Sequence, residues 1–130
     1  MPIIMGSAYK SIEREMTMLK CVEYPYGAKA VYYHANANEE YVSCFSLRNY
    51  EDRCEIWSLM TRHIYRHRGY AERMLHEFIE QFDFSKPLVL YVKRENNVAI
   101  HLYEKVGFKI TGDYTNYAYK MQYQGGIYES

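Results

Sequence analysis

Residues 88–92 are the feature that most limits the fold of this chain. Their sequence, LVLYV, is continuously apolar, which is typical of a strand covered on both faces. Before this run, residues 70–82 carry apolar side chains at helical spacing, with charged side chains opposite. After it, residues 98–106 form a second helical segment, which Asn97 caps and Gly107 closes. A helix, a buried strand and another helix in this order predict a mixed α/β sheet.

The first half of the chain is predicted to supply antiparallel strands. Polar breaks separate three strand-like segments, at residues 28–35, 40–49 and 55–61. Short polar loops join neighbouring strands, so these segments are expected to form a meander. Residues 108–110 and 117–123 supply a final hairpin, the second strand of which alternates tyrosines with smaller or polar residues.

The length of the chain predicts a single domain, residues 1–130. A chain of 130 residues can bury one core and is too short for two. Residues 11–20 have helical charge spacing but overlap a strand-like pattern, and we expect a helix followed by a strand there. The order of elements therefore predicts an α/β (α+β) fold with a mixed, mostly antiparallel central sheet of six to seven strands.

Charge and cysteine content narrow the partners and the compartment. Because 16 Lys and Arg balance 16 Asp and Glu, no long-range field draws the chain to nucleic acid or to an anionic membrane. We expect no general nucleic-acid binding and no membrane association. The three cysteines form neither an even disulfide set nor a C-x-x-C pair, which fits a reducing compartment. A cytoplasmic protein is predicted.

The segment 65–75, YRHRGYAERML, places several basic residues where a strand turns into a helix. His63 and His67 have the spacing of a helical zinc pair, but Ile64 stands where H-E-x-x-H needs its glutamate and no third ligand is near, so no metal site is predicted. If these basic residues were only solvated surface charges, their position at the strand-to-helix turn would have no explanation. Gly69 lets the backbone approach a ligand, and the helix start offers unpaired N–H groups. The loop is therefore predicted to bind a phosphate.

Two motifs connect this loop to a known family. Residues 66–71, RHRGYA, resemble the R/Q-x-x-G-x-G/A pyrophosphate loop of the GNAT acetyltransferase superfamily. Further on, ENNVAIHLYEKVGF is similar to the family's N-x-x-A-x-x-x-Y-x-x-x-G-F segment, with a helix and a buried strand in between. The resemblance covers about residues 55–110. It implies the GNAT-like acyl-CoA N-acyltransferase fold, with helices on both faces of the sheet and, here, a shortened N-terminal region.

The resemblance also implies acetyl-coenzyme A (acetyl-CoA) as cosubstrate. Backbone N–H groups of residues 68–71 would hold its pyrophosphate, and Arg66 and Arg68 would add positive charge. The strand WSLMT would lie along the pantetheine arm. The residues expected to bind the cosubstrate are Leu59, Met60, Thr61, Arg66, His67, Arg68, Gly69, Tyr70, Ala71, Asn96, Ala99 and Tyr103.

Two residues are predicted to catalyse the transfer. A lysine-like amine costs about 4 to 5 kcal/mol to neutralise at pH 7, so a base or a water chain to one is needed. Glu55 matches the position of the base glutamate in histone-type members of the superfamily, and its alternative is a solvated carboxylate at a strand edge. Tyr103 fits the general acid, because a phenol can donate to the departing thiolate. Its alternative is a helix tyrosine packed on the sheet.

The leading function is therefore an acetyl-CoA dependent N-acetyltransferase. The alternatives are an enzyme of the same scaffold with another acyl donor or an alcohol acceptor, and a non-catalytic module that binds CoA or a protein. Only about fifty residues precede the strand before the loop, so the acceptor site is left open. A small-molecule amine, a protein amine and an aminoacyl-tRNA are all acceptors to consider. The tyrosine-rich C-terminal segment would suit a homodimer as well as a substrate groove.

Overall fold

A seven-stranded sheet forms the body of the protein, in a computed structural model that describes residues 19–24 and 29–125. The strand order is β1-β2-β3-β4-β5-β7-β6. All neighbouring strands are antiparallel except β4 and β5, which are parallel. The strands are β1 (Lys20–Glu23), β2 (Lys29–Ala35), β3 (Tyr41–Asn49), β4 (Cys54–Thr61), β5 (Leu88–Lys93), β6 (Phe108–Thr115) and β7 (Ala118–Tyr123).

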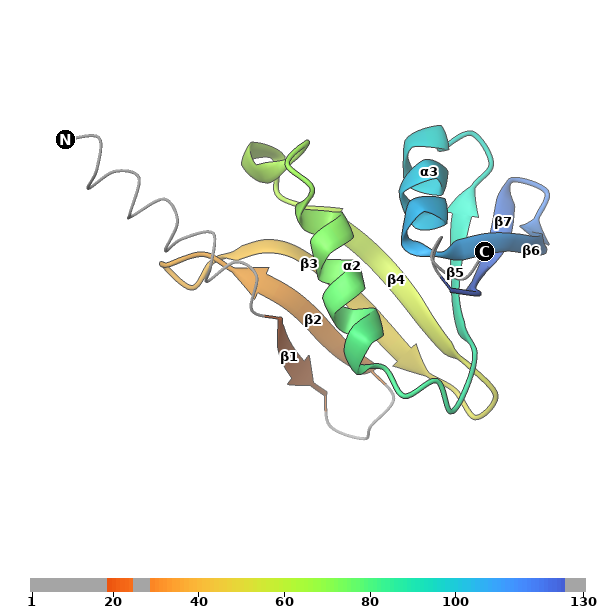
Figure 1. Ribbon diagram of the computed structural model, residues 1–130, viewed down its shortest axis with the longest axis horizontal. Helices are drawn as coiled ribbons and strands as arrows, with labels where there is room; N and C mark the ends of the chain where they lie inside the picture. Colours follow the sequence, from red (N-terminus) through yellow and green to blue (C-terminus); the bar gives the residue numbers. More distant parts are fainter. Residues whose placement is uncertain (1–18, 25–28, 126–130) are drawn as a thin grey trace.

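Two α-helices connect strands in the second half of the chain, and the first of them joins the parallel strands β4 and β5. A short turn of 3-10 helix, η1 (His63–Tyr65), follows β4 and leads into α2 (Tyr70–Gln81). The second helix, α3 (Asn97–Val106), connects β5 to β6. Figure 1 shows α2 in front of β3 and β4, and α3 beside β5, and both helices contribute to one core cluster on the same side of the sheet. We call this side of the sheet the helix face and the opposite side the open face.

The core lies between the helices and the helix face. It forms because alternate strand residues point to that side, where they meet the apolar stripes of α2 and α3. Its largest buried side chains are Phe45, Phe78, Phe108, Met74, Leu75, Leu88, Leu90 and Met121. Among the described residues, no helix is both long enough and apolar enough to cross a membrane.

The pairing of β4 with β5 stops part-way along both strands. The ladder joins Cys54 to Leu88, Glu55 to Val89 and Ile56 to Leu90. Beyond those pairs, β4 continues to Thr61 and β5 to Lys93 without further pairing between them. The two strands therefore diverge, and we call the gap between them the splay and its closed end the apex.

A bulge in β4 accompanies the splay. Ser46 of β3 pairs with Trp57, whereas Cys44 pairs with Met60, so two residues of β4 oppose one residue of β3. Ser58 takes a φ of 57°, a conformation that residues with a side chain seldom adopt. Such a bulge bends the strand and re-aims its backbone groups, here beside the splay.

The predicted order of elements is confirmed: a meander, a helix, a buried strand, a helix and a hairpin. One cap is shifted by a residue. The side chain of Asn96, not Asn97, accepts the N–H of Ala99 at 3.2 Å, so Asn97 is the first helical residue. The helix expected before Lys20 lies outside the described residues. Both described helices cover one face, where the family resemblance led us to expect helices on both.

Candidate active site

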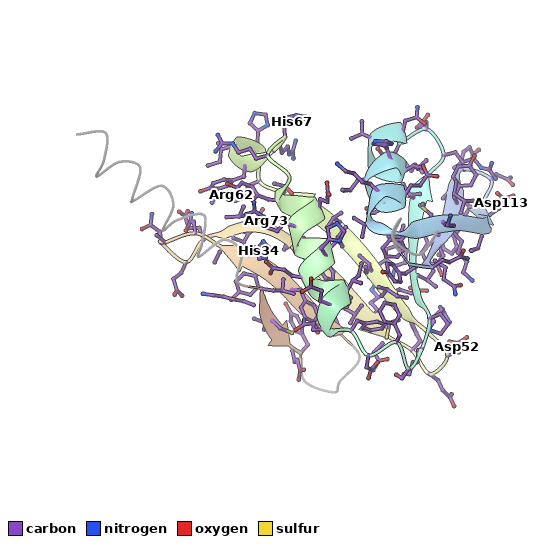
Figure 2. The ribbon with its side chains drawn as sticks, viewed as in Figure 1. His34, Asp52, Arg62, His67, Arg73 and Asp113 are labelled. Atoms are coloured by element: carbon purple, nitrogen blue, oxygen red, sulfur yellow. The ribbon has the colours of Figure 1, made fainter. Side chains whose placement is uncertain are left out.

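The loop between β4 and α2 ends in an open backbone cradle. Gly69 has a φ of 79°, and a Cβ placed there would meet nothing within 4 Å. The side chains of Arg66, His67 and Arg68 are exposed, and Arg66 Nε donates to the carbonyl of Thr61 at 3.0 Å. Figure 2 shows His67 at the tip of the loop, beyond the start of α2. The helix start can therefore receive an anion without a side chain in the way.

Tyr70 and Ala71 are the first two residues of α2, directly after Gly69. The Tyr70 side chain is only 4% exposed and packs against Val42 and the ring of Tyr65, so it anchors the start of α2 in the core. Ala71 is half-buried.

Among the described residues, no group of His, Cys, Asp and Glu has the geometry of a metal site, and both His63 and His67 are exposed.

The second half of β4 borders the splay. Leu59 and Thr61 are half-buried, while Met60 is 50% exposed. On one side these residues pair with β3, where Cys44 is the partner of Met60 and Ser43 is the partner of Thr61. On the other side they have no ladder partner, because pairing with β5 has ended at the apex. Backbone groups of β4 are thus available along the splay.

Tyr103 lies in the core on the helix face. It is 9% exposed and belongs to the core cluster that contains Ile56 and Leu90, the last residue pair before the splay. Burial raises the pKa of Tyr103 to about 12. No group of residues 19–24 or 29–125 forms a hydrogen bond with its hydroxyl, so a ligand can take that position. One turn earlier, Ala99 packs against the same cluster, while Asn96 is occupied as the helix cap.

Glu55 lies at the apex, close to the start of β4, and is 3% exposed. Arg53 Nε and the Tyr91 hydroxyl each donate to Oε2, at 2.8 and 2.7 Å, and Trp57 Nε1 donates to Oε1 at 2.6 Å. Burial raises the pKa of Glu55, but these hydrogen bonds outweigh it and leave the pKa below its usual value. Glu55 is a buried, ionised carboxylate and not the solvated strand-edge residue considered above.

Sequence reasoning missed the aromatic residues that cover Glu55 on the open face. Trp57 and Tyr91 are the first residues of β4 and β5 beyond the apex, and their ring centroids are 5.5 Å apart. The ring of Tyr114 stacks on Tyr91 at 3.8 Å. The sequence did contain one indication: Tyr91 lies inside the apolar run LVLYV, and a buried tyrosine hydroxyl needs a hydrogen-bond partner. Burial and Glu55 raise the pKa of Tyr91 to about 12.

The predicted residues thus fall into two groups, one at each end of β4. The phosphate cradle follows its C-terminal end, and Glu55 lies near its N-terminal end. Figure 2 shows the same separation between His67, in the loop, and Asp52, in the turn before β4. The splay lies between the two groups, and Tyr103 belongs to the core cluster that includes Ile56 and Leu90 at its apex.

A comparison with protein families identifies the chain. The model of the acetyltransferase (GNAT) family matches residues 6–108. The chain belongs to the GNAT family. No curated protein sequence shows significant similarity to it.

Solved structures of GNAT acetyltransferases share the fold of this GNAT chain. A chimera of the spermidine N-acetyltransferase SpeG from Vibrio cholerae and hSSAT matches with a TM-score of 0.64 and 21% identity, over 76% of this chain and 71% of that one. SpeG from Vibrio cholerae in complex with CoA and spermine matches with a TM-score of 0.60 and 21% identity, over 73% and 64%. PaiA from Thermoplasma acidophilum in complex with coenzyme A matches with a TM-score of 0.59 and 22% identity, over 75% and 60%. This chain therefore spans between 60% and 71% of the length of these three structures.

Proposed function

We propose that this chain is an N-acetyltransferase that moves the acetyl group of acetyl-CoA to a primary amine by direct attack. The observation that carries the proposal is the splay, which has an anion-binding helix start at one end of β4 and a buried carboxylate at the other. Family membership and the CoA in two of the similar structures support acetyl-CoA as cosubstrate. The spermidine acetyltransferases among them are named for an amine acceptor, which supports an amine here.

The cradle suits the pyrophosphate of CoA. The N–H groups of residues 68–71 meet at the start of α2, where the helix dipole adds a partial positive charge. Arg66 and Arg68 are exposed beside them, and each hydrogen bond from an arginine to an anion contributes about 1.5 to 3 kcal/mol. Gly69 leaves the approach clear.

The splay suits the pantetheine arm. In residues 59–61, the backbone groups that point away from β3 have no ladder partner and can pair with the amides of the arm, although the Thr61 carbonyl already accepts from Arg66 Nε. The bulge at Ser58 presents backbone N–H groups near the apex. Fixed donors at that point would stabilise negative charge as it develops on the thioester oxygen.

Tyr103 is the general acid in this proposal. In this assignment its hydroxyl reaches the splay from the helix face, and it stays protonated at neutral pH because burial raises its pKa to about 12. A thiolate leaving in the same buried pocket is destabilised by the same desolvation. Burial therefore raises the pKa of the departing thiol as well, so the difference in pKa between phenol and thiol is smaller than the raised pKa of Tyr103 alone suggests.

Glu55 is the base, and Tyr91 connects it to the acceptor. The carboxylate itself is covered, but the Tyr91 hydroxyl donates to it and keeps oxygen lone pairs toward the open face. As the amine attacks, the Tyr91 oxygen takes a proton from nitrogen and passes its own proton to Oε2 of Glu55. Protonation of Glu55 costs free energy because its pKa is lowered. The carboxylate therefore holds the proton only briefly before releasing it.

Rate measurements on three variants test this assignment. Glu55→Gln and Tyr91→Phe should lower the rate of acetyl transfer most at neutral pH, and less as the pH approaches about 10.4 and the amine deprotonates itself. Tyr114→Phe is the matched control, because Tyr114 stacks on Tyr91 while the hydrogen bond to Glu55 comes from Tyr91. Equal losses at every pH for Glu55→Gln, in protein shown to be folded, would remove the base role.

A further inference from the structure

The open face near the apex carries an arginine, Arg48, that has no ion pair or side-chain hydrogen bond among the described residues. Arg48 of β3 is half-buried, and its guanidinium lies 4.7 Å from the centre of the Trp57 ring. Although Arg48 is directly opposite Glu55 in the strand register, Glu55 is held by Arg53, Trp57 and Tyr91 instead. Over residues 19–24 and 29–125, Arg48 forms no ion pair or hydrogen bond through its side chain. Stacking on the indole fixes its position while leaving its five N–H donors free.

A second cation flanks the apex from the other side. Lys120 of β7 is the register partner of Tyr91, so both side chains project from the same face of the sheet. Lys120 is half-buried, and its ammonium has no ion pair or hydrogen bond within the part of the chain that the structure describes. Arg48 therefore stands on the β4 side of the apex and Lys120 on the β5 side.

Two acidic groups near the apex, Glu55 and Asp52, are already neutralised. Both oxygens of Glu55 accept hydrogen bonds, and Asp52 pairs with Arg53 at 2.8 Å. A polycationic acceptor would need unpaired carboxylates beside the apex, whereas within the part of the chain that the structure describes two cations there, Arg48 and Lys120, have no ion pair.

We propose that the acceptor is an amine that also carries a carboxylate, and that Arg48 binds that carboxylate, while Lys120 adds positive charge from the other side of the apex. This inference rests on the proposed acetyl transfer and names the acceptor class for the same site. The Trp57 ring lies between the Arg48 guanidinium and the Tyr91 ring, so the width of an indole separates the bound carboxylate from the reacting nitrogen. A short aliphatic spacer between amine and carboxylate spans this width.

The test compares three acceptors of equal chain length: δ-aminovalerate, pentylamine and cadaverine. They differ only in an anionic, neutral or cationic distal group. Trp57 is the only tryptophan of the chain, so its fluorescence reports binding at this position without catalysis. With CoA present, δ-aminovalerate should half-saturate the Trp57 signal at a concentration about tenfold or more below that of cadaverine. Equal or reversed preference, or no response to any of the three, would overturn the inference.

Variants identify the cations responsible. Arg48→Gln should remove most of the preference for δ-aminovalerate, and Lys120→Met should reduce it, each measured against its own baseline emission. Lys109→Met, at an exposed position of the edge strand β6, is the control with the same change in net charge. A preference that survives the double variant Arg48→Gln/Lys120→Met would contradict the assignment.

Acetyl transfer, measured separately by mass, distinguishes this inference from the proposed function. If binding depends on the carboxylate but no acetylated product forms, the carboxylate site is supported and the proposed acetyltransferase activity is contradicted. Acetylation of cadaverine in preference to δ-aminovalerate keeps the enzyme and removes the inference.

Discussion

Glu55 is a buried carboxylate whose charge is balanced by hydrogen bonds from Arg53, Trp57 and Tyr91. Because its folded-state pKa lies below the usual value of 4.5, ionised Glu55 stabilises the fold above that pH. This contribution is lost as the pH falls through the folded-state pKa, since the unfolded chain then binds the proton more readily.

We therefore expect Glu55→Gln to lower the free energy of unfolding by about 1 to 3 kcal/mol at neutral pH. The deficit should shrink on acidification below the usual pKa of 4.5, because only the wild type loses the ionised group. Urea unfolding of both proteins at neutral and acidic pH measures this. A deficit that stays constant over that range would show that the charge of Glu55 does not matter to the fold.

Tyr103 gives a different dependence on pH. Its pKa of about 12 keeps the phenol protonated through the whole range in which the protein can be assayed. Tyr103→Phe should therefore lower kcat by a similar factor, about a hundredfold, at every pH. Steady-state rates from neutral to alkaline pH check this prediction. A rate within about twofold of the wild type would leave Tyr103 as a packing residue.

At the scale of single elements, the start of α2 determines cofactor binding in this account. Gly69 has a φ of 79° and free space where a Cβ would stand. Gly69→Ala should cost about 1 to 2 kcal/mol of stability from the left-handed conformation, yet weaken CoA binding by about tenfold or more, because the added methyl group occupies the cradle. Calorimetric titration with CoA measures the loss.

Gly112→Ala on β6 is the matched control for that titration. A Cβ at Gly112 also meets nothing within 4 Å, but the position is far from the cradle along the strand order. Its affinity for CoA should equal that of the wild type. Unchanged affinity in Gly69→Ala as well would mean that CoA does not approach this backbone.

The elements were predictable to different degrees, for physical reasons. Alternating and helical patterns are local, so β2 to β7, α2 and α3 follow from the sequence. The splay and the bulge at Ser58 depend on strand register, which tertiary packing decides. The pairing of Glu55 with Tyr91 joins residues 36 positions apart, so neither local pattern contains it.

For the whole molecule, the sheet separates the two substrates in this account. The helix face holds the cradle, the core and Tyr103, while the open face holds Trp57, Tyr91 and Arg48. The splay is the place where the β4–β5 ladder is interrupted. We therefore expect the cosubstrate to enter from the helix face and the amine to enter from the open face.

The most direct test of this account is the release of free CoA from acetyl-CoA, measured with and without a primary amine. The account predicts release that depends on the amine, with a matching acetylated amine by mass spectrometry, and a large loss in Tyr103→Phe. Thermal stabilisation by acetyl-CoA in the same samples shows that the cosubstrate binds. Stabilisation by acetyl-CoA without amine-dependent release, for any primary amine including δ-aminovalerate, would contradict the account and leave a CoA-binding module.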